Sequence, residues 1–166
     1  MKTLIAYSTL TGNTKRVAQE VKKAIIDSEM LDIADVKSLD YDLIIVGTWI
    51  DKGTADKKAV DFIKTLTNKK VAFFFTLGAN PDSDHCKKCT ENVTNLFLEN
   101  NNEVIGHYFC QGAVDPKLIE QMRKMFPADH PHGVNPENEA RWKVASTHPD
   151  EKDLENAYNY FKNLEK

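Results

Sequence analysis

The stretch TLIAYSTLTGNTKRVAQEV, residues 3–21, joins a strand pattern to a helix pattern through a short polar loop. Residues 3–7 have the composition of a buried strand. Val17 and Val21 begin a series of apolar residues at helical spacing. The loop between them, Ser8–Thr14, consists mostly of hydroxyl and amide side chains with one glycine. The stretch therefore predicts a strand, a polar loop and the N-terminus of a helix.

The alternation of strand and helix patterns continues along the chain. Further strands are predicted at 33–36, 43–47, 71–75 and 104–109, and helices around 17–25, 60–66, 93–98, 115–126 and 154–164. The runs 43–47 and 71–75 are continuously apolar, as in strands buried on both faces, whereas 33–36 is short and mixed, as in an edge strand. Right-handed crossovers between such strands predict a flavodoxin-like α/β fold: a three-layer, doubly wound sandwich whose five parallel strands have the order 2-1-3-4-5.

The chain length is that of a single domain. With 166 residues, we expect one domain over 1–166. Residues 126–150 are rich in Pro and His at their start and are predicted to be a loop-rich segment, since too few residues follow for a second core. Residues 151–166 are predicted to form a final amphipathic helix that packs on the sheet.

Composition excludes several classes of protein. The net charge is −3 and the basic residues form only scattered pairs, so we expect no nucleic-acid partner. No apolar run approaches the roughly 20 residues of a membrane span, and no signal-peptide pattern is visible, so we expect no membrane partner and a cytoplasmic location. Three cysteines argue against a disulfide framework. We expect a monomer or a weak dimer.

Three loops are predicted to meet at one crevice. In an open sheet of this order, ligands bind beyond the carboxyl ends of the strands, between the first and third strands. The loops that reach this point are Ser8–Thr14, Thr48–Ala55 and Thr76–His85.

The first loop offers neutral donors to a phosphate. The donors are the N–H groups of the helix start and the side chains of Ser8, Thr9, Thr11, Asn13 and Thr14. Sites of phosphoryl transfer place a cation on the phosphate, but this loop contains neither Lys nor Arg. A single helix cap would need one such side chain rather than five. The loop therefore predicts a static anchor for a monophosphate.

The other two loops suggest a planar ligand. Trp49 follows a buried strand and could stack on an aromatic ring, although Trp residues at such places also pack on apolar neighbours. Gly53 permits a positive φ, and Asp51 lies near any bound ring. Gly78 allows the backbone of the third loop to approach a ligand closely.

The spacing Cys86-x-x-Cys89 leaves three interpretations open. The pair could form half a zinc site completed by His85 or Cys110, a redox dithiol, or two incidental cysteines. A lone CxxC is a weak signal, and we expect no metal site.

With these loops in view, the chain resembles the flavodoxin family. Residues 8–14 are similar to that family's phosphate loop, [ST]-x-T-G-N-T, and Gly47-Thr48-Trp49 and Phe75–Ala79 to its second and third loops. The resemblance implies non-covalent FMN, one-electron transfer between redox partner proteins (a reductase and an acceptor), and no catalytic acid, base or nucleophile. The residues that it places at the cofactor are Ser8, Thr9, Leu10, Thr11, Gly12, Asn13, Thr14, Thr48, Trp49, Ile50, Asp51, Lys52, Gly53, Thr76, Leu77, Gly78, Ala79 and His85.

The third loop departs from the family pattern. Flavodoxins usually place a tyrosine there on the outer face of the flavin, but this chain has no aromatic residue between Gly78 and Asp84, and His85 is the only ring that could substitute. Without such a ring, the outer face of the flavin would be open to a small substrate. An FMN-dependent NAD(P)H:quinone-type oxidoreductase is therefore an alternative function. A non-catalytic binding or signalling module on the same fold is a further alternative, although the strand ends lack the clustered aspartates of a receiver.

Overall fold

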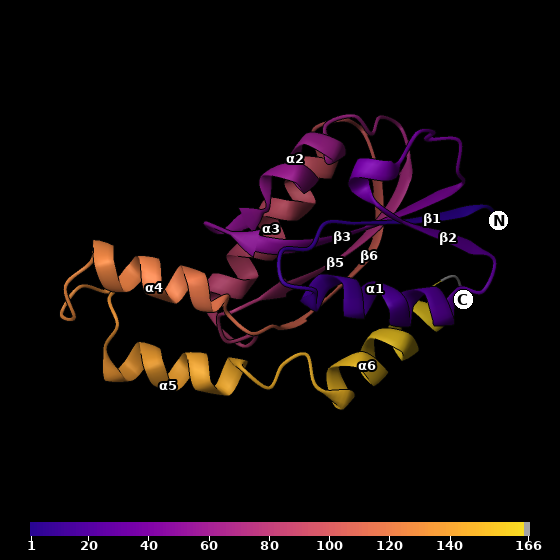
Figure 1. Ribbon diagram of the computed structural model, residues 1–166. Coiled ribbons are helices and arrows are strands. Elements are labelled where there is room, and N and C mark those ends of the chain that lie inside the picture. The colour runs from indigo at the N-terminus through magenta and orange to yellow at the C-terminus, as the bar shows by residue number, and fades with distance from the viewer. Residues whose placement is uncertain (165–166) are drawn as a thin grey trace.

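The computed structural model describes residues 1–164 and shows a six-stranded sheet (Figure 1). Its strands are β1 (Thr3–Tyr7), β2 (Ser28–Asp32), β3 (Leu43–Asp51), β4 (Thr54–Ala55), β5 (Lys70–Leu77) and β6 (Glu103–Gln111). The main path runs β2-β1-β3-β5-β6 with every neighbouring pair parallel, and β4 pairs antiparallel with the end of β3. With β4 set aside, this is the predicted order 2-1-3-4-5, so the flavodoxin-like prediction is confirmed.

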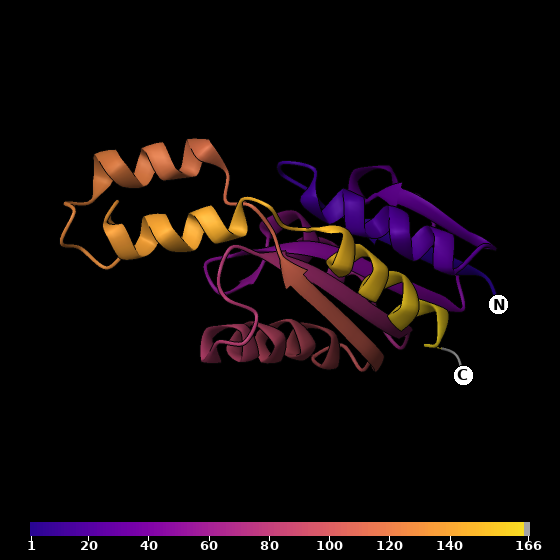
Figure 2. The same ribbon diagram turned by 90° about the horizontal axis from the view of Figure 1, so that it is seen from below.

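Helices cover both faces of the sheet. The helices are α1 (Asn13–Ala24), η1 (a 3-10 turn, Ile33–Asp35), α2 (Lys57–Ile63), α3 (Asp84–Leu98), α4 (Pro116–Met125), α5 (Pro136–Ala145) and α6 (Glu151–Lys162). Figures 1 and 2 show α1 and α6 on one face and α2 and α3 on the other. None of the described helices combines the length and the apolar character that crossing a membrane would require.

Alternating side chains of β5 build the two cores. Successive residues of a strand point to opposite faces. The Phe73 ring stacks on Phe97 of α3 at 5.6 Å between centroids, whereas the Phe74 ring meets Phe161 of α6 edge-on at 5.9 Å. Both of these phenylalanine rings are fully buried. The central strands are therefore apolar on both faces, as their sequence predicts.

Two helices stand outside the layers. In both views α4 and α5 lie side by side beyond the carboxyl ends of the strands (Figures 1 and 2), and we call residues 116–145 the arm. No residue of α4 is buried, whereas Trp142 and Asn138 of α5 are. The arm therefore sits at the end of the sheet where the three loops converge.

The prediction of an edge strand at residues 33–36 is wrong. The edge strand is β2, which pairs with β1 from Thr3 opposite Ser28 to Tyr7 opposite Asp32. Strand structure ends at Asp32 because its carboxylate accepts a hydrogen bond from Ala34 N at 2.8 Å and starts the 3-10 turn η1.

Three segments predicted as loops are partly regular. Residues 126–150 contain α5, which begins at Pro136 and is capped by Asn135. Residues 48–55 form a hairpin, because β3 continues to Asp51 and turns into β4. The third loop is shortened because Ser83 caps α3 and the helix starts at Asp84. Of the predicted final helix, α6 covers Glu151–Lys162, and residues 165–166 lie outside the described residues.

Candidate functional site

A pocket of about 630 Å³ lies at the end of the sheet where strand order reverses. Its volume is within the range of small-molecule sites, roughly 300–1,000 Å³. The predicted site residues that line it are Thr9, Leu10, Thr11, Asn13, Thr14, Trp49, Ile50, Asp51, Lys52, Thr76, Leu77 and Gly78. All three predicted loops therefore contribute to one pocket.

Two predicted site residues, Ser8 and Thr48, are buried and do not line the pocket. The hydroxyl of Ser8 donates to the Asp56 carboxylate at 2.7 Å, and the hydroxyl of Thr48 donates to its other oxygen at 2.6 Å. All three residues are buried. Asp56, which the sequence analysis missed, therefore ties the first loop to the hairpin.

The remaining predicted residues that do not line the pocket are Gly12, Gly53, Ala79 and His85. The two glycines form turns, with φ of +99° and +84°. His85 lies on exposed helix surface in α3, with Nε2 3.6 Å from the sulfur of Cys89. No ring from the third loop therefore reaches the pocket.

The N-terminus of α1 carries unpaired amides. Its N-cap is Gly12, which has no side chain to cap the helix, whereas each of the other five α-helices has a side-chain cap. Thr11, Asn13 and Thr14 line the pocket, and within residues 1–164 their backbone N–H groups have no hydrogen-bond acceptor. Unpaired N–H groups and the helix dipole together favour an anion at this point.

Side chains of the first loop hold it in shape. Thr9 Oγ1 accepts from Gly12 N at 3.0 Å, and the buried hydroxyls of Thr14 and Thr76 lie 3.0 Å apart. Asn13 donates through Nδ2 to the carbonyl of Ala113 at 3.1 Å. Much of the hydroxyl and amide content therefore fixes the loop, so that its backbone amides are the main donors left for an anion.

The hairpin positions Trp49 at the pocket. Lys52 and Gly53 both have positive φ, 52° and 84°, as a two-residue type I′ turn requires. Asn92 of α3 donates through Nδ2 to the Gly53 carbonyl at 2.8 Å and anchors the tip. Trp49 is partly exposed and lines the pocket. An indole at this place can stack on a planar ligand.

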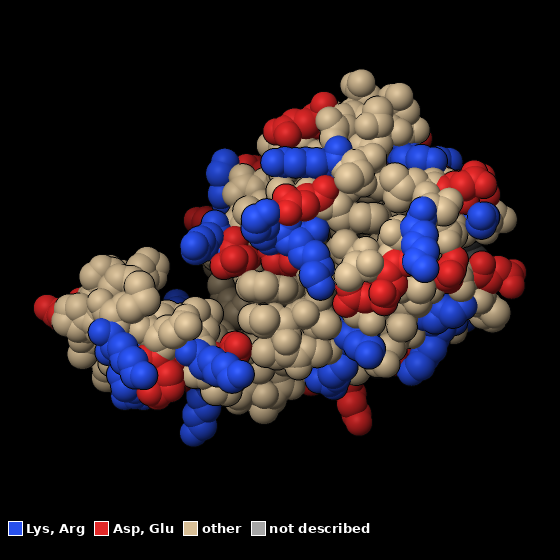
Figure 3. All heavy atoms as spheres, turned by 45° about the horizontal axis from the view of Figure 1, so that its top comes forward, with Lys and Arg blue, Asp and Glu red and all other residues tan. Residues whose placement is uncertain are grey.

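The arm completes the pocket, which the sequence analysis did not foresee. Six of its residues line the pocket. One is Gln121, and the other five form what we call the α4 wall: Leu118, Met122, Met125, Phe126 and His132. Figure 3 shows the surface hollowed where the arm meets the body. The amphipathic pattern of residues 116–125 predicted a helix, but its apolar face turns to the pocket rather than to the sheet.

The cysteine pair has no ligand-binding geometry. Cys86 and Cys89 are buried, and burial raises the pKa of Cys86 to about 11 and also raises that of Cys89. Both thiols are therefore protonated at neutral pH, which disfavours a reactive dithiol. Within residues 1–164 only His148, Asp150 and Asp153 bring three possible metal ligands together, and the two aspartates form the capping box of α6.

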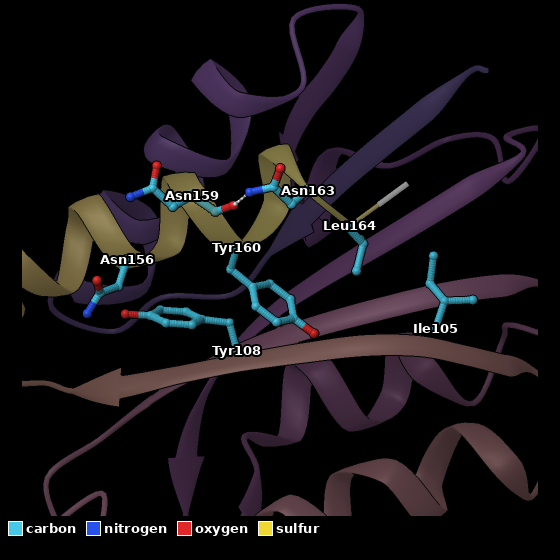
Figure 4. A pocket seen from close by; sticks show the side chains of 7 residues that line it. All are labelled: Ile105, Tyr108, Asn156, Asn159, Tyr160, Asn163 and Leu164. Carbon is cyan, nitrogen blue, oxygen red and sulfur yellow. Dashed lines mark hydrogen bonds between the residues drawn. The ribbon is translucent and has the colours of Figure 1, made fainter. Parts of the chain in front are cut away.

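A second hollow lies between β6 and α6 and has no lining residue from the three loops (Figure 4). Tyr108 and Tyr160 line it, but both hydroxyls are engaged by backbone. Tyr160 accepts from His107 N at 2.9 Å, and Tyr108 donates to the Asp153 carbonyl at 2.7 Å. The two tyrosines thus fasten α6 to the edge strand and offer little to a cofactor.

Comparison with known proteins agrees with this geometry. The sequence profile of the flavodoxin domain matches residues 4–162. The flavodoxin-like domain-containing protein BilS of Clostridioides difficile (strain CD3) is 31% identical, with 99% of this chain and 96% of that protein covered.

Two solved structures share the fold. Oxidised flavodoxin 1 from Bacillus cereus has a TM-score of 0.63 at 16% identity and covers 99% of this chain and 97% of its own. A flavoprotein in complex with FMN from Lactobacillus acidophilus has a TM-score of 0.50 at 23% identity and covers 65% of this chain and 92% of its own. With its profile match, its relative and its strand order in agreement, the chain belongs to the flavodoxin domain family.

Proposed function

We propose that the chain binds FMN non-covalently and carries electrons between redox partner proteins, a reductase and an acceptor. The observation that carries the proposal is that one pocket combines the uncapped start of α1 with Trp49. Family membership supports it, and so does the FMN held by the flavoprotein from Lactobacillus acidophilus.

The residues of the pocket fit the two ends of FMN. The unpaired amides of Thr11, Asn13 and Thr14 suit the phosphate, since each donates to an anion without adding a mobile charge. Trp49 suits the ring, because an indole offers a large flat apolar surface. The phosphate loop follows β1 and Trp49 lies in β3, and these two strands are neighbours in the sheet. One ligand can therefore contact the loop with its phosphate and the indole with its ring.

Bound FMN would supply the redox chemistry, and the protein would supply orientation and surroundings. The type I′ turn at Lys52 and Gly53 and the bond from Asn92 hold the hairpin still beside the ring. Asp56 holds the hairpin to the phosphate loop through Ser8 and Thr48. These contacts keep the two binding elements at a constant separation.

An absorption spectrum of the purified protein tests the cofactor. We expect flavin bands in the protein as isolated or after FMN is added and the excess removed. A chain that retains no flavin under either condition overturns the proposal.

The carrier role needs a separate test. FMN-loaded protein, reduced by a flavoprotein reductase, is expected to pass electrons to a haem protein such as cytochrome c used as a probe. Sustained turnover of a reduced nicotinamide with a quinone by the FMN-loaded chain alone contradicts the carrier role and favours the oxidoreductase.

A further inference from the structure

The α4 wall faces the same pocket as Trp49, on residues that the family's three loops do not supply. We propose that this wall covers the outer face of the flavin ring, the face turned away from Trp49, and takes the place of the aromatic residue that the third loop lacks. The inference rests on the proposed binding of FMN.

The third loop cannot cover the ring itself. Of residues 78–83, only Gly78 lines the pocket. A Cβ at this position would lie 2.5 Å from Cγ2 of Val114, so a larger residue would collide with the segment that leads into α4. Because Gly78 has no side chain, the segment that leads into α4 can pack against the third loop, the loop that carries the tyrosine in most flavodoxins.

The start of α4 is fastened to the phosphate loop and the third loop. Asn13 donates to the carbonyl of Ala113, and Gln111 donates through Nε2 to the carbonyl of Gly78 at 3.4 Å. Asp115 caps α4 by accepting from Lys117 N at 3.0 Å. The helix therefore leaves the body at the pocket, and its capped N-terminus does not compete with α1 for a phosphate.

The apolar face of α4 is not covered by the described protein. Although its apolar residues gather on one side, none of them is buried, and Met125 and Leu118 are 70% and 44% exposed. Covering such a face with an aromatic ring removes apolar area from water on both partners. Methionine sulfur also makes favourable contacts with aromatic rings.

The loop after α4 is built to hold rings in place. Phe126 stacks on His130 with 4.4 Å between ring centroids, and His132 lies 5.8 Å from Phe126. Asn138, only 4% exposed, donates through Nδ2 to the carbonyls of Pro131 and Gly133 at 2.9 and 2.7 Å. A buried amide that satisfies two loop carbonyls fixes the loop and presents Phe126 and His132 to the pocket.

Flavin affinity tests the proposal. Phe126→Ala and Met122→Ala remove wall contacts, and Ile119→Ala removes a similar side chain of α4 that does not line the pocket. Dissociation constants are measured for FMN and for riboflavin, which has the ring without the phosphate. We expect each wall variant to bind both ligands about tenfold more weakly, and Ile119→Ala to bind like the unchanged chain.

The outcomes separate this inference from the proposed function. If the unchanged chain binds FMN and the wall variants bind both ligands equally well, the wall does not cover the ring, while FMN binding stands. If the unchanged chain binds neither ligand, both proposals fall. Should Phe126→Ala fail to fold, as judged by far-UV circular dichroism, Phe126→Leu is expected to fold and to weaken both ligands to a smaller degree. Unchanged affinity in that folded variant and in Met122→Ala overturns the inference.

Discussion

Asp56 is the residue on which the geometry of the site depends most. Its carboxylate accepts from the hydroxyls of Ser8 and Thr48 and caps α2 by accepting from Ala59 N at 3.3 Å. It is 3% exposed. A buried carboxylate is costly unless its oxygens are hydrogen-bonded, and here each oxygen has a partner. Asp56 therefore joins the first loop, the hairpin and a helix at one point.

Asp56→Ala should destabilise the fold by about 3 kcal/mol, since it removes a helix cap, leaves the hydroxyl of Ser8 buried without its acceptor and takes from Thr48 the nearer of its two acceptors. Urea unfolding followed by circular dichroism measures the change. Asp61→Ala, which removes an exposed partner of Lys57, is the control and should leave the midpoint unchanged. Equal midpoints for the two variants would contradict this role for Asp56.

Gly12 sets the direction of the phosphate loop. Its φ of +99° is costly for any residue with a Cβ, although a Cβ there would meet no neighbour within 4 Å. Gly12→Ala should therefore reorient the amides that follow. We expect the affinity for FMN to fall about tenfold and the affinity for riboflavin to change little. Paired titrations with the two ligands measure the ratio. A loss shared equally by FMN and riboflavin would show that the loop does not serve the phosphate.

The thiol of Cys86 gives the fold a dependence on alkaline pH. Burial, and next the nearby Cys89 and Asp82, raise its pKa from 9.0 to about 11. A pKa raised on folding means that the folded protein holds the proton more tightly, so this stabilisation is complete below pH 9 and is lost as pH rises towards 11. Urea unfolding between pH 8 and 11 should show a decline that is smaller in Cys86→Ala. Parallel declines in the two proteins would exclude this group as the cause.

At the scale of elements, the hairpin depends on α3. Asn92→Ala removes the donor to the Gly53 carbonyl and should cost about 1 kcal/mol of stability. Because the same hairpin carries Trp49, flavin affinity should fall with it. Asn95→Ala, an exposed asparagine of α3, is the matched control. Titration with riboflavin detects the effect on the ring site, and equal affinities in the two variants would separate the hairpin anchor from binding.

The strands were predictable where burial is continuous along the sequence. β1 is observed with the predicted bounds, and the predicted 43–47 and 71–75 lie inside β3 and β5. β2 was missed because SEMLD mixes charged and apolar residues, and its strand structure depends on pairing with β1. α5 was missed because its apolar residues do not gather on one face, although Asn135 and Pro136 are a normal helix start.

The site was predictable where it is local. The loop after β1 and the residue Trp49 could be identified because a short motif follows a buried strand. The α4 wall could not, since it depends on contacts between segments distant in sequence, such as Gly78 with Val114 and Asn13 with Ala113. The hydrogen bond from Ser8 to Asp56 could not be predicted either, because the two residues lie 48 positions apart in the sequence.

At the scale of the whole molecule, a layered body carries a helical arm at its ligand-binding end (Figures 1 and 2). Charges of both signs are intermingled on the face that Figure 3 shows. If the arm covers the flavin, small substrates lose the ring face on which they would stack. Such a structure suits a carrier whose electrons pass to other proteins better than an enzyme that binds a small acceptor.

Amide hydrogen exchange, measured with and without FMN, should show whether the ligand protects the arm as well as the body. A ligand that binds only the folded state stabilises it by about 2.7 kcal/mol at a concentration 100 times its dissociation constant, so slow exchange of the core amides should become slower throughout. Local protection should appear at residues 9–14 and 49–52 and also at 116–132, because α4 has no buried residue and opens easily when its apolar face lacks a partner. The groove between β6 and α6, lined by Tyr108 and Tyr160, should show only the general slowing. Protection confined to 9–14 and 49–52 would mean that FMN binds without the arm, because a wall in contact with the ring must lose some of its opening motion when the ring is present.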